Sequence, residues 1–169
     1  MTDIDCLANL DPEYATIVGP LLENADVLSM NKYRHHDRTA LTHSLGVSKK
    51  AYSIAKHLRL DASSVARGAL LHDFFLYDWR DGKNPKHPSN HARIALANAT
   101  KRFRLNRIEE DIIMAHMWPV CRPFYSYAES ALVSLVDKVV STREVLLLLR
   151  RSVARLIHRL TVRGLTQVS

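Results

Sequence analysis

Histidine and aspartate are the side chains in this sequence whose types and spacing could do chemistry. The chain has nine histidines among 169 residues, and one of them is directly followed by an aspartate. The candidate set, in chain order, is His43, His72, Asp73, His87, His116 and Asp137. Neutral imidazole nitrogens and carboxylate oxygens are ligands for zinc, iron, manganese or cobalt, and a carboxylate can bridge two metals through its two oxygens. These residue types suggest a site for divalent metals.

Most of these polar residues fall on the apolar side of a predicted helix. His43 precedes Val47 and Ala51 by four and eight residues, and the same stripe continues to Ile54 and Leu58. The other members also lie at helical spacing from apolar residues: His72 and Asp73 from Val65 and Ala69, His116 from Ile112 and Ile113, and Asp137 from Val133, Val136 and Val140. Four helices therefore aim imidazole or carboxylate groups inward.

A buried, unpaired carboxylate is costly, so two inward aspartates need cationic partners. Each residue alone could have a role without metal. A histidine could be hydrogen-bonded in the core, Asp73 could be a loop carboxylate, and Asp137 could form an ion pair with Lys138. A divalent metal satisfies all of the groups together, and six coincidences in one chain are less probable. Bound metal is therefore the favoured interpretation.

The elements that must position these residues are helices. Asp11 with Pro12 begins a helix to about Leu28, a second carries His43, and Asp61 caps a third that ends near the aromatic residues at 74–79. Further helices are predicted from Pro88 to about Phe103, after Asn106 as far as Trp118, and from about Tyr127 to Leu165 with a break near Ser141 and Thr142.

No convincing strand pair is found, so the fold class predicted is all-α. The prediction is one helical domain over residues 1–169, with a motif-bearing core at about 33–142 and an amphipathic basic helix at about 143–165. Hydrophobic residues make up 47% of the chain, no apolar run approaches the ~20 residues that cross a bilayer, and the N-terminus has no secretory layout. A cytoplasmic protein without a membrane partner is expected.

The net charge of +7 is concentrated late in the chain. Arg151, Arg155, Arg159 and Arg163 recur every four residues and form one stripe of the last helix, while four leucines, one valine and one isoleucine form another. The interpretation preferred here is an outer helix packed on the bundle with a solvated basic face. Nucleic-acid or membrane binding through this helix is the alternative.

The motifs, in their order along the chain, resemble those of the HD-domain superfamily of metal-dependent phosphohydrolases. The resemblance rests on Arg38 with Thr42-His43-Ser44, on the segment GALLHD at 68–73, and on LVDK at 135–138, and it covers about residues 33 to 142. The segments KHP at 86–88 and AHM at 115–117 resemble the additional histidines of members with six ligands.

The resemblance implies that one metal is held by His43, His72, Asp73 and Asp137, and a second by His87 and His116 with Asp73 as the bridge. His72 and Asp73 would be central to catalysis, and the metal would be Fe, Mn, Mg, Zn or Co. His91 lies four residues after His87 and could replace or supplement it. The candidates for substrate contact are His36, Arg38, Lys83, Lys86, His91 and Lys138, for which solvated surface residues are the alternative.

The implied reaction is hydrolysis of a phosphomonoester or phosphodiester, with a nucleotide among the candidate substrates, by a metal-activated water. The same ligands resemble those of di-iron HD-type oxygenases, and the spacing does not separate the two. A non-catalytic regulatory or nucleic-acid-binding module is the third reading. The substrate, the native metal and the oligomeric state stay open.

Overall fold

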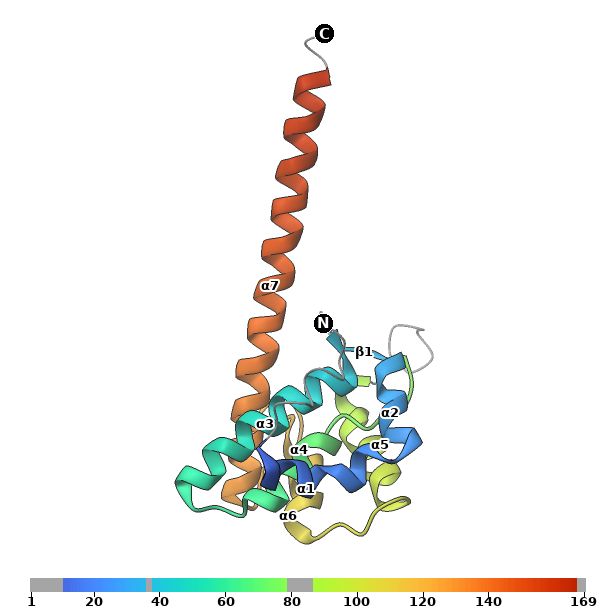
Figure 1. Cartoon of the computed structure of the whole chain (residues 1–169), viewed down its shortest axis with the longest axis vertical. Coiled ribbons are helices and arrows are strands. Elements are labelled where there is room, and N and C mark those ends of the chain that lie inside the picture. Colours follow the sequence, from blue (N-terminus) through green and yellow to red (C-terminus); the bar gives the residue numbers. More distant parts are fainter. Residues whose placement is uncertain (1–10, 36–37, 79–86, 167–169) are drawn as a thin grey trace.

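The computed structural model describes residues 11–35, 38–78 and 87–166, except for the side chains at 35, 87–89 and 156–166. Within these ranges the regular secondary structure is helical apart from one small hairpin (Figure 1), so the all-α prediction is confirmed. The elements are α1 (Pro12–Leu22), α2 (Ala25–Ser29), the 3-10 helix η1 (Met30–Lys32), β1 (Arg34–His35), β2 (Arg38–Thr39), α3 (Ala40–Leu58), α4 (Ala62–Leu71), α5 (His87–Thr100), α6 (Arg107–Ala115) and α7 (Ala128–Thr166).

Side-chain caps explain where several helices begin. The carboxylate of Asp11 accepts from the amides of Glu13 and Tyr14, and that of Asp61 accepts from the amide of Ser64. Asn106 and Glu109 form a reciprocal capping box at the start of α6. The three helix starts predicted at Asp11, Asp61 and Asn106 are thus confirmed.

Three details of the elements predicted before α7 are wrong. The first predicted helix is two helices, because Asn24 caps a new one with its side-chain oxygen. Arg34–His35 and Arg38–Thr39 form a two-stranded antiparallel pair that the sequence reading missed. On α3 the buried stripe runs through Val47, Ala51 and Ala55, whereas Ile54 and Leu58 are exposed, since Leu58 is the last residue of α3 and Ile54 lies on the edge of its buried side.

The core lies between the helices that carry the candidate ligands. One buried cluster joins α1 and α4 through residues such as Tyr14, Leu21 and Leu70, and a second joins α3, α4, α6 and α7 through Val47, Ala69 and Ile112 among others. Gly68 allows α4 to approach α6 closely, because a Cβ at this position would lie 2.9 Å from Cδ1 of Ile112.

The last helix, α7, is continuous through Ser141 and Thr142, so the predicted break does not occur. Its first part packs on α3 and α6, and its outer half extends away from the body of the molecule (Figure 1). The apolar residues Leu146, Leu149 and Val153 are exposed there, so the prediction that the basic segment of this helix packs on the bundle is wrong for these residues. Among the described residues, no helix combines the length and apolarity needed to span a membrane.

Candidate metal centre

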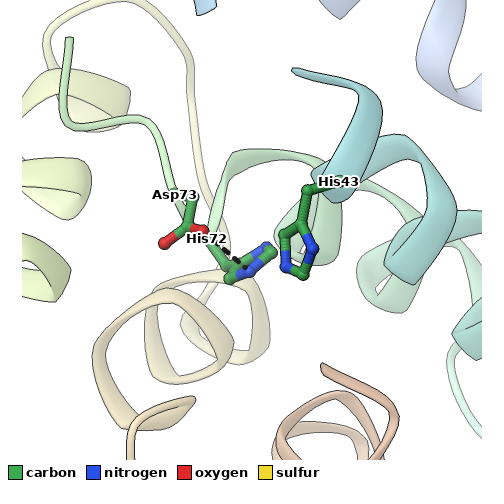
Figure 2. Close-up of side chains that lie close together, drawn as sticks. All are labelled: His43, His72 and Asp73. Carbon is green, nitrogen blue, oxygen red and sulfur yellow. Dashed lines mark ion pairs between the residues drawn. The ribbon is translucent and has the colours of Figure 1, made fainter. Parts of the chain in front are cut away.

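Five helices bring the candidate ligands to one buried place. His43 lies in the first turn of α3, His72 and Asp73 directly follow α4, and His116 follows α6. Asp137 lies on α7. The fifth helix, α5, contributes His91. All six side chains belong to residues that are at most 8% exposed, and Figure 2 shows three of them, His43, His72 and Asp73.

Asp73 lies between two groups of histidines. Its Oδ2 atom is 3.4 Å from Nε2 of His72, while its Oδ1 atom is 3.6 Å from Nε2 of His91 and 3.8 Å from Nε2 of His116. Two sets of potential ligand atoms, His43 with His72 and Asp73, and Asp73 with His91 and His116, each lie within 4.8 Å of one another. One carboxylate therefore belongs to both sets and offers Oδ2 to His72 and Oδ1 to His91 and His116.

The backbone fixes the orientation of two of the imidazole rings. Nδ1 of His72 donates to the carbonyl of Ala69 at 2.7 Å, and Nδ1 of His116 donates to the carbonyl of Ile113 at 2.8 Å. With the proton of each ring on Nδ1, Nε2 carries a lone pair that faces the centre. This arrangement is usual for a histidine that binds a metal.

His43 is held from both sides by carboxylates. Its Nε2 atom is 3.0 Å from Oδ1 of Asp137, and its Nδ1 atom is 3.1 Å from Oε2 of Glu144. Burial alone would lower the pKa of His43, but the hydrogen bonds with these two carboxylates raise it to about 10. Burial opposes ionisation of Asp137, yet the hydrogen bond with His43 and the nearby His72 and His116 hold its pKa well below the usual range.

His116 has the opposite character. Burial and the neighbouring His72 and His91 lower its pKa to about 3, so its ring stays neutral near pH 7. Its Nε2 atom lies 3.0 Å from Nε2 of His91, with both rings buried. Two imidazole nitrogens at this separation share one proton, or they donate their lone pairs to a common cation.

The donor set fits a divalent metal. Nε2 of His72 is buried and makes no hydrogen bond within the described part of the chain. A buried polar atom without a partner is costly, and a cation between His72, Asp73 and Asp137 would satisfy it. The ligand atoms are imidazole nitrogens and carboxylate oxygens without a thiolate, which suits zinc, iron, manganese or cobalt.

Five of the six predicted ligands are described, and the structure brings them together: His43, His72, Asp73, His116 and Asp137. The side chain of the sixth, His87, lies outside the description, whereas His91, the predicted substitute, joins Asp73 and His116. Of the candidates for substrate contact, His36, Lys83 and Lys86 also lie outside the described residues.

The two other basic candidates have different surroundings. Arg38 is about half exposed, and its Nε lies 3.5 Å from Oε1 of Glu144. The ammonium group of Lys138 donates to the carbonyls of His116 and Ser134 and to the hydroxyl of Ser134, at 2.7 to 3.1 Å. These bonds match the three donors of a lysine, so Lys138 ties α7 to the end of α6.

Glu144 is the residue of this centre that the sequence reading missed. It is 5% exposed and contacts both Arg38 and His43. A signal existed in the sequence, because Glu144 follows Asp137 by seven residues, which is two helical turns. Phe74 and Phe75, which directly follow Asp73, are buried in the core.

Comparison with known proteins agrees with the geometry. Residues 40–120 match the family model described as HD domain, a range that contains His43, His72, Asp73, His91 and His116 but ends before Asp137. Comparison with curated proteins gave no match, and comparison with solved structures gave none either. The resemblance read from the motifs is supported at the level of the superfamily. Residues 40–120 are therefore similar to an HD domain, the all-α fold of a superfamily of metal-dependent phosphohydrolases.

Proposed function

We propose that this protein hydrolyses a phosphomonoester or phosphodiester at a centre that holds one or two divalent metals. A nucleotide is one candidate substrate. The observation that carries the proposal is the placement of Asp73, whose Oδ2 faces His72 and whose Oδ1 faces His91 and His116. A carboxylate that offers one oxygen to each of two ligand groups is suited to bridge two cations.

The residues would divide between two positions. His43, His72, Asp73 and Asp137 would hold the first cation, and Asp73 with His91 and His116 would hold the second. His87 stays a candidate ligand at the second position. Iron, manganese, magnesium, zinc and cobalt are the candidate metals, and such a cation lowers the pKa of water and neutralises charge on a phosphoryl group.

The protein's own contribution is orientation and charge. The carbonyls of Ala69 and Ile113 keep the rings of His72 and His116 with Nε2 toward the centre. The low pKa of His116, caused first by its burial, keeps that ring neutral. The half-exposed guanidinium of Arg38 lies at the edge of the centre next to Glu144, where it would contact phosphate oxygens of the substrate.

The test measures bound metal and phosphate release on the same protein. Protein purified without oxygen is analysed for metal, stripped with a chelator, and reloaded separately with each candidate metal. Phosphate release is then followed with p-nitrophenyl phosphate, with bis-p-nitrophenyl phosphate and with a panel of nucleotides. Release with at least one metal, and none after stripping, is the expected result. Oxygen uptake by the iron-loaded protein, with no phosphate release from any substrate, would favour an oxygenase instead.

A variant links the activity to the proposed residues. Asp73→Asn keeps the size of the side chain but removes its charge, and we expect it to lose bound metal and phosphate release together while its circular dichroism stays helical. Asp26→Asn is the matched control, because Asp26 pairs with Arg102 on the surface of α2 and takes no part in the centre. Unchanged metal content in Asp73→Asn would refute the site.

A further inference from the structure

The outer side of α7 carries a row of exposed apolar residues. Leu135, Val139, Leu146, Leu149 and Val153 are each between 55% and 62% exposed. The opposite side of the same helix is covered, because Val133, Val136 and Val140 are buried against α3 and α6. The row starts where α7 is packed on the body and continues onto the part that extends away from it (Figure 1). Large apolar side chains in such a row mark a surface that binds another molecule.

The spacing of the row identifies the kind of surface. Its members, with Thr142 between Val139 and Leu146, are separated alternately by four and three residues, and the sequence continues this alternation at 156 and 160 with two leucines. An average separation of 3.5 residues is the repeat of a coiled coil, in which two helices meet along one apolar row, here called the seam. A helix that lies on a membrane has a broader apolar side, without a strict heptad repeat.

The residue types within the repeat favour a second copy of this chain. The seven positions of this repeat are labelled a to g, and the seam consists of a and d. Valine occupies two of the a positions, Val139 and Val153, and leucine occupies the d positions at Leu135 and Leu149. β-Branched residues at a with leucine at d favour two parallel strands. Identical helices in parallel register bring each seam residue against its own counterpart, so one row is sufficient for both partners.

The charges next to the seam permit this pairing. In a parallel pair, each g residue faces the following e residue of the partner, which gives Lys138 against Arg143 and Val145 against Arg150. The first contact would join like charges, but Lys138 is directed to its own body, where its amine donates to His116 and Ser134. The second contact joins a valine to the apolar stem of an arginine. Arg151 and Arg155 occupy outward f and c positions.

We infer that α7 pairs with α7 of a second copy in a parallel two-stranded coiled coil, with Val139, Leu146, Leu149 and Val153 in its seam. The described part of the seam, from Leu135 to Val153, is about 27 Å long at 1.5 Å per residue. The pairing covers the exposed apolar row and is independent of the reaction that the metal centre catalyses.

The first experiment is sedimentation equilibrium of the full chain across a dilution series. The expected mass is twice that of one chain. The double variant Leu146→Glu with Leu149→Glu should be a monomer that keeps its helical circular dichroism, because both side chains are solvent-exposed in the single chain. Arg151→Glu with Arg155→Glu is the matched control on the outward positions and should stay dimeric.

The second experiment fixes the direction of the helices. Val153→Cys at an a position should form a disulfide-linked dimer under mild oxidation, because parallel register brings the two copies of residue 153 together. In an antiparallel pair they would lie far apart. A wild-type chain that is monomeric at every concentration would overturn the inference, and so would a dimer that survives Leu146→Glu with Leu149→Glu or fails to link through residue 153. A monomer that sediments with vesicles of anionic lipid would assign the row to a membrane surface.

Discussion

Glu144 and His43 lie 3.1 Å apart between Oε2 and Nδ1, although α7 and α3 are distant in the sequence. The carboxylate accepts a hydrogen bond from Nδ1–H, and the other ring nitrogen, Nε2, is directed to the centre near Asp137. Carboxylates in this position orient metal-binding histidines and increase their basicity. Glu144 thus connects the point where α7 leaves the body to the proposed metal ligands.

Glu144→Gln is expected to weaken metal binding without abolishing it. The amide oxygen can still accept from Nδ1 of His43, but the negative charge is gone. The dissociation constant for the metal should rise by about 10- to 100-fold, the range found when a hydrogen-bonding partner of a metal-bound histidine is changed. Titration calorimetry on stripped protein measures it, with Glu110→Gln, an exposed position on α6, as the control. Equal affinities for the two variants would contradict this role.

His91→Ala tests whether His91 or His87 is the ligand at the second metal position. If His91 completes the set with Asp73 and His116, the variant binds one metal fewer per chain than the wild type under saturating conditions. Elemental analysis after gel filtration gives the ratio. His57→Ala is the control, since His57 is exposed on α3. A full complement of metal in His91→Ala would assign this position to His87.

Gly68→Ala and Gly46→Ala should change stability in opposite directions. A Cβ at Gly68 would lie 2.9 to 3.0 Å from side-chain atoms of Ile112, whereas a Cβ at Gly46 has no atom within 4 Å. Overpacking of this kind costs about 1–3 kcal/mol, which outweighs the gain in helix propensity. Replacing Gly46 within α3 should stabilise the fold by up to about 1 kcal/mol. Urea unfolding measures both, and a stabilised Gly68→Ala would show that α4 and α6 can move apart at little cost.

Tyr14 makes the fold sensitive to high pH. Burial raises the pKa of Tyr14 to about 12, against the weaker opposing effect of its hydrogen bond to Ser48. The unfolded chain loses this proton from about pH 10. The contribution of Tyr14 to the free energy of unfolding is therefore fully present below pH 10. It falls as the pH rises toward 12, by at most about 1.4 kcal/mol per pH unit.

Tyr14→Phe removes this dependence, although it also loses the hydrogen bond to Ser48, worth about 1 kcal/mol at neutral pH. Urea unfolding at pH 8 to 11 should therefore give a shallower decline in stability than for the wild type. Tyr127→Phe, at a partly exposed position, should decline as the wild type does. If the stability of the wild type and of Tyr14→Phe fell equally steeply with pH, another ionisable group would dominate the loss of stability at alkaline pH.

Local chemistry made the helix starts and most of the centre predictable. Asp11, Asp61 and Asn106 are caps whose function depends on a few neighbouring residues. His43 and Asp137 could be placed inside because periodicity reports which side of a helix is apolar. Periodicity does not choose between His87 and His91, because they are four residues apart in the sequence and both fit the same helical spacing.

Long-range contacts account for most of what was missed. The link from Glu144 to His43 depends on how α7 crosses α3, which no local pattern gives. Ser141 and Thr142 have modest helix propensity, but the packing of Val140 and the hydrogen bond from Ser141 to Asp137 hold the helix through them. An apolar stripe such as Leu146 to Val153 predicts that something covers it, without saying whether the cover is the chain's own body.

The two sides of α7 determine whether the metal centres of two paired chains could contact each other. Val136 and Val140 face the chain's own body, while Leu135 and Val139 face away from it. Two chains joined along the outward side would keep their bodies apart, so each would hold a complete centre built from its own residues. A mixed pair with one Asp73→Asn copy would therefore turn over substrate at half the rate of the intact pair, with no rescue or inhibition across the helices.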